Sequence, residues 1–164
     1  MIKNGIYAAG LSILNEDMSL DTQSTIEHAE SAIKNGLHGV FFFGSTGQSQ
    51  LISISEKKEL ISRTVTSKFR DKFYIGTGIN SLNDNLDLIR YSMEYGFQTF
   101  LIMPPAYYRG NTDEGIYNFY KEIITRVPKI KIILYNFEKL SGYLFNAEIV
   151  KKLVEKFPKQ IVGC

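Results

Sequence analysis

Ile161-Val162-Gly163-Cys164, the last four residues of the 164-residue sequence, read as the first half of a buried β-strand. Apolar, β-branched residues without polar alternation are typical of a strand that is covered on both faces in a parallel sheet. Five pairs of strand and helix precede this stretch, so a sixth strand begins at Ile161. We therefore expect the sequence to be part of a longer protein, and we expect the next residue of this strand to matter for any active site.

Short apolar runs like this one recur along the whole sequence, and amphipathic segments separate them. The earlier runs span residues 6–14, 40–43, 73–78, 100–103 and 130–135. Apolar residues at helical spacing lie between the runs, in residues 26–33, 60–69, 82–93, 116–127 and 149–157, and we interpret them as core-facing stripes. One βα unit thus repeats roughly every 30 residues.

Residues that begin and end helices agree with this division. Ser53-Ile54-Ser55-Glu56 is a capping box that opens the second helix. Asp21 and Asn146 are the other predicted N-cap residues. Gly36 and Gly96 are placed to end helices in the left-handed conformation, and Pro128 and Pro158 end two further helices.

Two architectures are built from such units. A (β/α)₈ barrel typically has about 250 residues, whereas an open, doubly wound sheet could be completed by a chain of this length. Periodicity does not choose between them, but the unfinished sixth strand favours the barrel. We predict an α/β fold in which residues 1–164 form an incomplete (β/α)₈ barrel domain, namely the first five βα units and the start of the sixth strand.

Composition excludes several classes of function. The formal net charge is +2, and the lysines and arginines are spread among the helices, so we expect no nucleic-acid partner. No apolar run approaches the ~20 residues of a membrane span, so we expect no membrane partner. The single cysteine, Cys164, excludes an internal disulfide and fits a cytoplasmic location.

The carboxyl ends of the strands are where either architecture places its chemistry. Gly44-Ser45-Thr46-Gly47 follows the second strand, and such a turn can present consecutive backbone N–H groups and two hydroxyls to a small carboxylate. The alternative is an ordinary strand-to-helix turn. It is not a P-loop, because no Gly-Lys-Ser/Thr follows.

Tyr135 ends the fifth strand, where its hydroxyl could act as a proton donor or shuttle. A buried structural tyrosine is the alternative. No set of His, Cys, Asp and Glu residues has metal-ligand spacing, so we expect no metal and no cofactor.

Taken together, these segments resemble the dihydrodipicolinate synthase and N-acetylneuraminate lyase superfamily of pyruvate-dependent class I aldolases. The matching residues are Gly44-Ser45-Thr46-Gly47, Tyr107-Tyr108 ahead of Glu114-Gly115, Tyr135-Asn136-Phe137, Leu140-Ser141-Gly142 and Ile161-Val162-Gly163. They occur in order along essentially the whole sequence.

The resemblance implies a role for each of these segments. Gly44, Ser45, Thr46 and Gly47 would bind the pyruvate carboxylate, with Thr46 also counted as catalytic. Tyr135 would transfer protons, and Tyr108, also counted as catalytic, would lie near the site or a subunit interface. The Schiff-base lysine would come directly after Cys164. The family also implies a small 2-keto acid as the partner and a homotetramer as the assembly.

Leu140 separates the subfamilies, because dihydrodipicolinate synthases usually carry an arginine there that holds the carboxylate of aspartate semialdehyde. We therefore expect a lyase that releases pyruvate from a 2-keto-3-deoxy sugar acid or a sialic-acid-like substrate, with Leu140 in the substrate site. The alternatives are a 4-hydroxy-tetrahydrodipicolinate synthase, which condenses pyruvate with aspartate semialdehyde, and a doubly wound small-anion-binding domain without enzymatic activity.

Overall fold

The structure is a computed structural model, and it describes residues 4–164. These residues form one parallel sheet of 6 strands in the order β1-β2-β3-β4-β5-β6. The strands are β1 (Tyr7–Ala9), β2 (Gly39–Phe42), β3 (Phe73–Gly76), β4 (Thr99–Ile102), β5 (Lys131–Leu134) and β6 (Ile161–Gly163). Each strand pairs with the next one in the chain, so every crossover connects neighbours.

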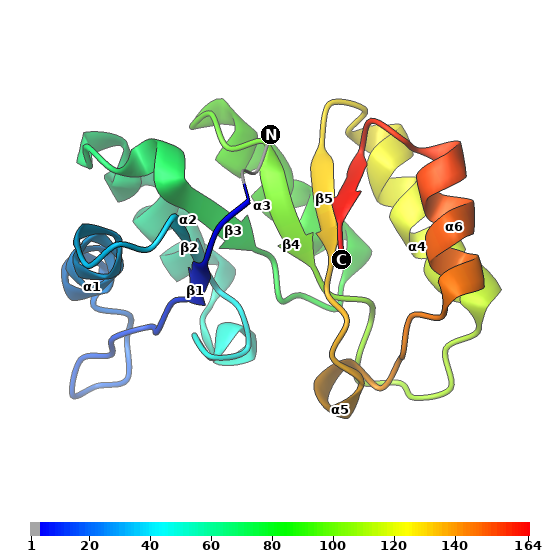
Figure 1. Cartoon of the computed structure of the whole chain (residues 1–164). Helices are drawn as coiled ribbons and strands as arrows, with labels where there is room; N and C mark the ends of the chain where they lie inside the picture. Colours follow the sequence, from blue (N-terminus) through cyan, green and yellow to red (C-terminus); the bar gives the residue numbers. More distant parts are fainter. Residues whose placement is uncertain (1–3) are drawn as a thin grey trace.

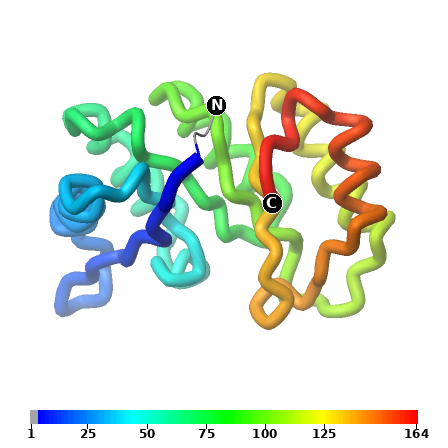
Figure 2. Tube along the Cα trace, in the orientation of Figure 1, coloured from blue at the N-terminus to red at the C-terminus, as the bar shows by residue number. Residues whose placement is uncertain are grey.

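The helices lie along the outer side of the curved sheet, in chain order (Figures 1 and 2). They are α1 (Thr22–Lys34), α2 (Ile54–Arg63), α3 (Leu82–Glu94), α4 (Asp113–Arg126), α5 (Glu138–Ser141) and α6 (Ala147–Lys156), with short 3₁₀ turns η1 (Ser49–Leu51), η2 (Thr64–Thr66) and η3 (Arg70–Lys72). Helix α1 packs on α2, α2 on α3, α3 on α4 and α4 on α6. This sequential layer is the arrangement of a (β/α)₈ barrel.

The open, doubly wound sheet is therefore wrong, because such a sheet reverses its strand order partway and this one does not. The described residues form five βα units and the sixth strand of a (β/α)₈ barrel, as the sequence predicts. The reason is the regular spacing of apolar runs and helices, since each right-handed crossover places the next strand beside the last.

Burial alternates along the strands within residues 4–164, and the residues that face the helices are the more buried ones. Phe100 and Ile102 in β4 are completely buried under the helices, whereas Leu101 between them is only partly buried. The same alternation holds for Phe41, Tyr74 and Ile133 on the neighbouring strands. Helices cover the outer face, but only side chains from other strands meet on the inner face. Phe41 and Tyr74, for example, stack with their rings 4.9 Å apart.

The helix ends follow the sequence signals closely. Ser53 and Glu56 make the reciprocal bonds of a capping box, and Asp21 and Asn146 accept the N-cap bonds of α1 and α6. Gly36 and Gly96 adopt positive φ values of 100° and 86° after α1 and α3. These local rules hold because each one satisfies backbone groups that the helix itself leaves unpaired.

Two boundaries differ from the sequence prediction by five residues or more. The first strand ends at Ala9 and does not continue to Leu14, because Ser12 and Ile13 bond to Gly47 and Thr25 and not to a neighbouring strand. The second helix ends at Arg63, so Val65 and Phe69 lie outside it. There the Thr64 hydroxyl donates to the Ile61 carbonyl at 2.6 Å, and the chain tightens into η2.

Within residues 4–164 no helix is both long enough and apolar enough to cross a membrane.

Candidate active site

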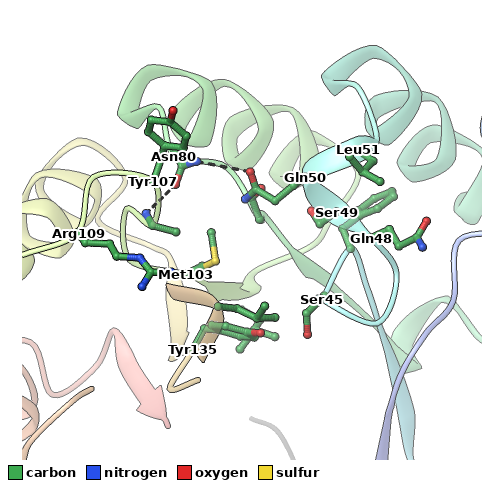
Figure 3. A pocket seen from close by; sticks show the side chains of 16 residues that line it. Ser45, Gln48, Ser49, Gln50, Leu51, Asn80, Met103, Tyr107, Arg109 and Tyr135 are labelled. Carbon is green, nitrogen blue, oxygen red and sulfur yellow. Dashed lines mark hydrogen bonds between the residues drawn. The ribbon is translucent and has the colours of Figure 1, made fainter. Parts of the chain in front are cut away.

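A cavity of about 590 Å³ opens at the carboxyl ends of β2, β3, β4 and β5 (Figure 3). These strand ends lie toward the bottom of Figure 1, on the side of α5. The walls of the cavity come from the loops that follow the strands, as expected for a barrel of this kind. The lining residues are Phe43, Gly44, Ser45, Gln48, Ser49, Gln50, Leu51, Gly78, Asn80, Leu101, Met103, Ala106, Tyr107, Arg109, Tyr135 and Leu140.

The turn after β2 presents a run of backbone donors. Its fold is fixed by two bonds, from Gln48 N to Ser45 O (3.0 Å) and from Ser12 Oγ to Gly47 O (2.6 Å). In residues 4–164, no acceptor bonds the N–H groups of Ser45, Thr46 and Gly47. Consecutive free N–H groups of this kind form an anion-binding nest.

Gly47 is required in that turn by close packing. A Cβ there would lie 2.7 Å from the carbonyl oxygen of Gly10, well inside van der Waals contact. The glycine therefore lets the turn pack against the chain that follows β1. Ser45 and Thr46 remain exposed at its tip, where their hydroxyls and N–H groups are accessible to a ligand.

Tyr135 follows β5 and lines the same cavity. Its backbone N–H donates to Ile102 O at 3.1 Å, which fixes the residue beside β4. Its hydroxyl is buried and has no hydrogen-bond partner among residues 4–164. An unpaired buried hydroxyl costs roughly 1–3 kcal/mol, so its retention at a cavity wall is typical of a functional group that awaits a ligand.

A chain of polar contacts ties the loops of β2, β3 and β4 together along one wall (Figure 3). Gln50 Nε2 donates to Gly78 O at 2.6 Å, and Asn80 Nδ2 donates to Gln50 Oε1 at 3.5 Å. Asn80 Oδ1 in turn accepts from Ala106 N at 2.8 Å. Asn80 therefore positions the beginning of the loop that carries Tyr107, Tyr108 and Arg109.

The loop after β5 is held from the opposite side. Tyr143 Oη donates to Asp113 Oδ1 at 2.6 Å, and Asn146 Nδ2 donates to Asp113 Oδ2 at 2.8 Å. The bond from Tyr143 is the main reason why the pKa of Asp113 is lowered, so this carboxylate stays ionised at the start of α4. The short helix α5, which carries Leu140, is thereby fixed above the cavity.

Lys57 on α2 is almost fully buried, with 1% of its surface exposed. Its Nζ donates to Thr77 O at 3.0 Å and lies 5.7 Å from the centre of the Phe43 ring. No carboxylate among residues 4–164 pairs with it, and burial lowers its pKa to about 8. Lys57 therefore links α2 to the end of β3 from behind the Gly44–Gly47 turn.

Four of the residues that the sequence singled out line the cavity: Gly44, Ser45, Tyr135 and Leu140. Thr46 and Gly47 belong to the same turn but not to the lining. Tyr108 lies outside the lining with 82% of its surface exposed, while the neighbouring Tyr107 contributes to the wall. Roles for these residues remain predictions.

Sequence reasoning missed Gln50, Asn80 and Arg109, all of which line the cavity. Each lies in the segment that follows a strand, at the edge where function was expected. That position was the available signal, but the direction of a loop side chain depends on contacts that the sequence does not display. Among the described residues no group of His, Cys, Asp and Glu side chains is arranged to hold a metal ion.

Comparison with known proteins identifies the family. Residues 3–164 match the model of the dihydrodipicolinate synthetase family. The chain is 38% identical over 138 residues to a 4-hydroxy-tetrahydrodipicolinate synthase of Legionella pneumophila, which covers 83% of this chain and 46% of that protein. The chain spans about half the length of the curated relatives it matches.

Solved structures agree with the fold. A dihydrodipicolinate synthase from Agrobacterium tumefaciens superposes with a TM-score of 0.91 at 23% identity, over 98% of this chain and 57% of that one. A dihydrodipicolinate synthase from Acinetobacter baumannii, complexed with pyruvate, gives 0.84 at 26% identity, over 97% and 54%. The chain belongs to the dihydrodipicolinate synthetase family.

Proposed function

From membership in this family and from the geometry of the strand ends, we propose that the whole protein is a class I aldolase that joins pyruvate to an aldehyde. The observation that carries the proposal is one cavity lined by Ser45, from the turn with unbonded N–H groups, and by Tyr135, whose buried hydroxyl has no partner among residues 4–164. The first group suits a carboxylate, and the second suits proton transfer.

Pyruvate is the proposed first substrate. Its carboxylate would accept hydrogen bonds from the N–H groups of Ser45, Thr46 and Gly47 and from the two hydroxyls. The relative from Acinetobacter baumannii that was solved with pyruvate supports this assignment, since it shares the fold of this chain. Gly44 and Gly47 would shape the turn without themselves touching the reacting atoms.

The nucleophile is proposed to be a lysine directly after Cys164. In the sheet, Ile133 pairs with Gly163, so continuing this register would place Cys164 beside Leu134 and the next residue beside Tyr135. Residues that pair across neighbouring strands point to the same face. A lysine there would lie next to the Tyr135 hydroxyl, where its amine can attack the pyruvate carbonyl carbon and release water.

Tyr135 would then transfer protons, first as the Schiff base forms and later between the enamine adduct and the aldehyde oxygen. Thr46 would support this by holding the carboxylate and by orienting the tyrosine hydroxyl. Tyr108 is proposed to act from the edge of the site or across a subunit interface, which fits its exposed ring. A homotetramer and a cytoplasmic location remain predictions.

Condensation with aspartate semialdehyde is the reaction that we propose first, because the similar curated proteins are named 4-hydroxy-tetrahydrodipicolinate synthases. Retro-aldol release of pyruvate from a sugar acid is the second candidate, and Leu140 favours it because leucine cannot form a bidentate pair with a carboxylate. Initial rates with pyruvate plus aspartate semialdehyde, compared with cleavage of 2-keto-3-deoxygluconate and N-acetylneuraminate, distinguish the two. Faster cleavage than condensation would reverse our order.

A further inference from the structure

Charge is distributed unevenly around the cavity. Among residues 4–164, Arg109 is the one lining residue whose side chain carries a formal charge. The other polar members are hydroxyls and amides, such as Ser45, Asn80 and Gln50. This part of the lining therefore offers a ligand one cationic group and no anionic one.

Arg109 is exposed, and no carboxylate or other acceptor within residues 4–164 bonds its guanidinium. Its stem passes beside Gly142, where a Cβ would lie 3.5 Å from Arg109 Cγ. Gly142 has a φ of 69° and ends α5, so Arg109 lies against the loop that carries Leu140.

The side chain extends from the loop after β4 toward Met103 and the Tyr135 wall, while Ser45 lies on the other side of the view (Figure 3). The lining thus includes two separate groups that suit an anion, the turn at Ser45 and the guanidinium of Arg109. Pyruvate has one carboxylate, which the proposed function assigns to the turn at Ser45. The guanidinium of Arg109 is then left for a second anionic group.

We infer that Arg109 is a specificity-determining residue that binds a carboxylate on the second substrate, the aldehyde. Arginine matches the two oxygens of a carboxylate with parallel N–H donors. Arg109, on the loop after β4, would form the bidentate pair with a carboxylate that Leu140 on α5 cannot form. The inference rests on the proposed aldolase function, and it removes the conflict between Leu140 and an aldehyde that carries a carboxylate.

The test uses the whole protein and two aldehydes, aspartate semialdehyde and the uncharged glyceraldehyde. Arg109→Leu is expected to lower kcat/KM for aspartate semialdehyde by about tenfold to a hundredfold, the loss of one charge-assisted contact. Rates with glyceraldehyde and the KM for pyruvate are expected to stay within about twofold. Arg109→Leu combined with Leu140→Arg should restore selectivity, because the guanidinium returns to the same part of the cavity.

Arg90→Leu is the matched control, since Arg90 is an exposed residue of α3 outside the cavity. Equal losses with both aldehydes would make Arg109 structural, and a selective rise in the pyruvate KM would assign it to pyruvate; either result overturns the inference.

A second readout does not depend on turnover. Succinate binding, followed by NMR titration, should weaken at least about tenfold in Arg109→Leu; no succinate binding to the unmodified protein also overturns the inference. Failure of the aldolase function itself would appear separately, as a lack of pyruvate trapping.

Discussion

Tyr135 shows how the strand before a residue fixes its position. Its backbone is fixed by the bond to Ile102, while its buried hydroxyl lacks a partner among the described residues. Tyr135→Phe removes only that hydroxyl, so the melting temperature should stay the same or rise slightly. We expect turnover of the whole protein to fall by about 10²–10⁴, the range for a positioned proton-transfer group. Near-normal turnover would reduce Tyr135 to a packing residue.

Lys57 gives a prediction about pH and stability. Burial lowers its pKa from 10.5 to about 8, so the unfolded chain binds its proton more tightly than the folded one. Stability should therefore increase as pH rises from 8 toward 10.5. Between pH 7 and pH 9.5 the gain from this residue is about 2 kcal/mol in the free energy of unfolding.

Urea denaturation of the unmodified protein and of Lys57→Met at these two pH values measures the effect. Lys57→Met keeps the volume of the side chain but cannot titrate, so its stability should lack this increment. Lys58→Met, on the neighbouring and more exposed lysine, serves as the control. An equal pH dependence in Lys57→Met and in the unmodified protein would show that Lys57 is not the titrating group.

Arg109 and Leu140 show the limit of sequence reasoning at the residue scale. Leu140 was predicted to lie in the substrate site because it belongs to the Leu140-Ser141-Gly142 motif, and the structure does bring it to the cavity. Arg109 was not identified, because its direction depends on the bonds of Asn80 to Ala106 and on the left-handed Gly142. Such contacts join loops that lie far apart in sequence, and no local pattern encodes them.

The capping box of helix α2 also connects this helix to the segment before α1. Ser53 caps its first turn, and Glu56 accepts from Ser53 N at 2.9 Å and from Leu20 N at 2.8 Å. The hydroxyl of Ser53 is the main cause of the lowered pKa of Glu56, followed by the N–H of Leu20. The capping box could be predicted from four residues, whereas the bond to Leu20 could not, because Leu20 lies 36 positions away.

Ser53→Ala tests this element directly. Loss of an N-cap hydroxyl typically lowers the free energy of unfolding by about 1 kcal/mol. We expect that loss in urea denaturation at pH 7, with Ser62→Ala as a control on a serine of the same helix that takes no part in the cap. The account of this helix end is contradicted if Ser62→Ala destabilises the protein as much as Ser53→Ala.

For the whole molecule, the repeat of apolar runs was enough to predict a parallel α/β sheet, and the sixth strand that begins at Ile161 favoured the sequential order of a barrel, which the structure shows. It was not enough to predict which face of each strand is buried, because helices and inner strands both bury apolar side chains. Leu101 and Phe100 illustrate this, since they are adjacent and similar in hydrophobicity but differ in exposure. Successive side chains of a strand point to opposite faces, so Phe100 faces the helices and Leu101 faces the inside of the sheet.

The central claim is that pyruvate forms a Schiff base at the end of β6, beside Tyr135 and opposite the Ser45 nest. Borohydride reduction of the whole protein in the presence of pyruvate, followed by peptide mass mapping, tests it most directly. We predict one modified lysine, at the position that directly follows Cys164. Modification of Lys57, Lys139 or Lys159 instead, or no modification under conditions that trap a known family member, would contradict the account.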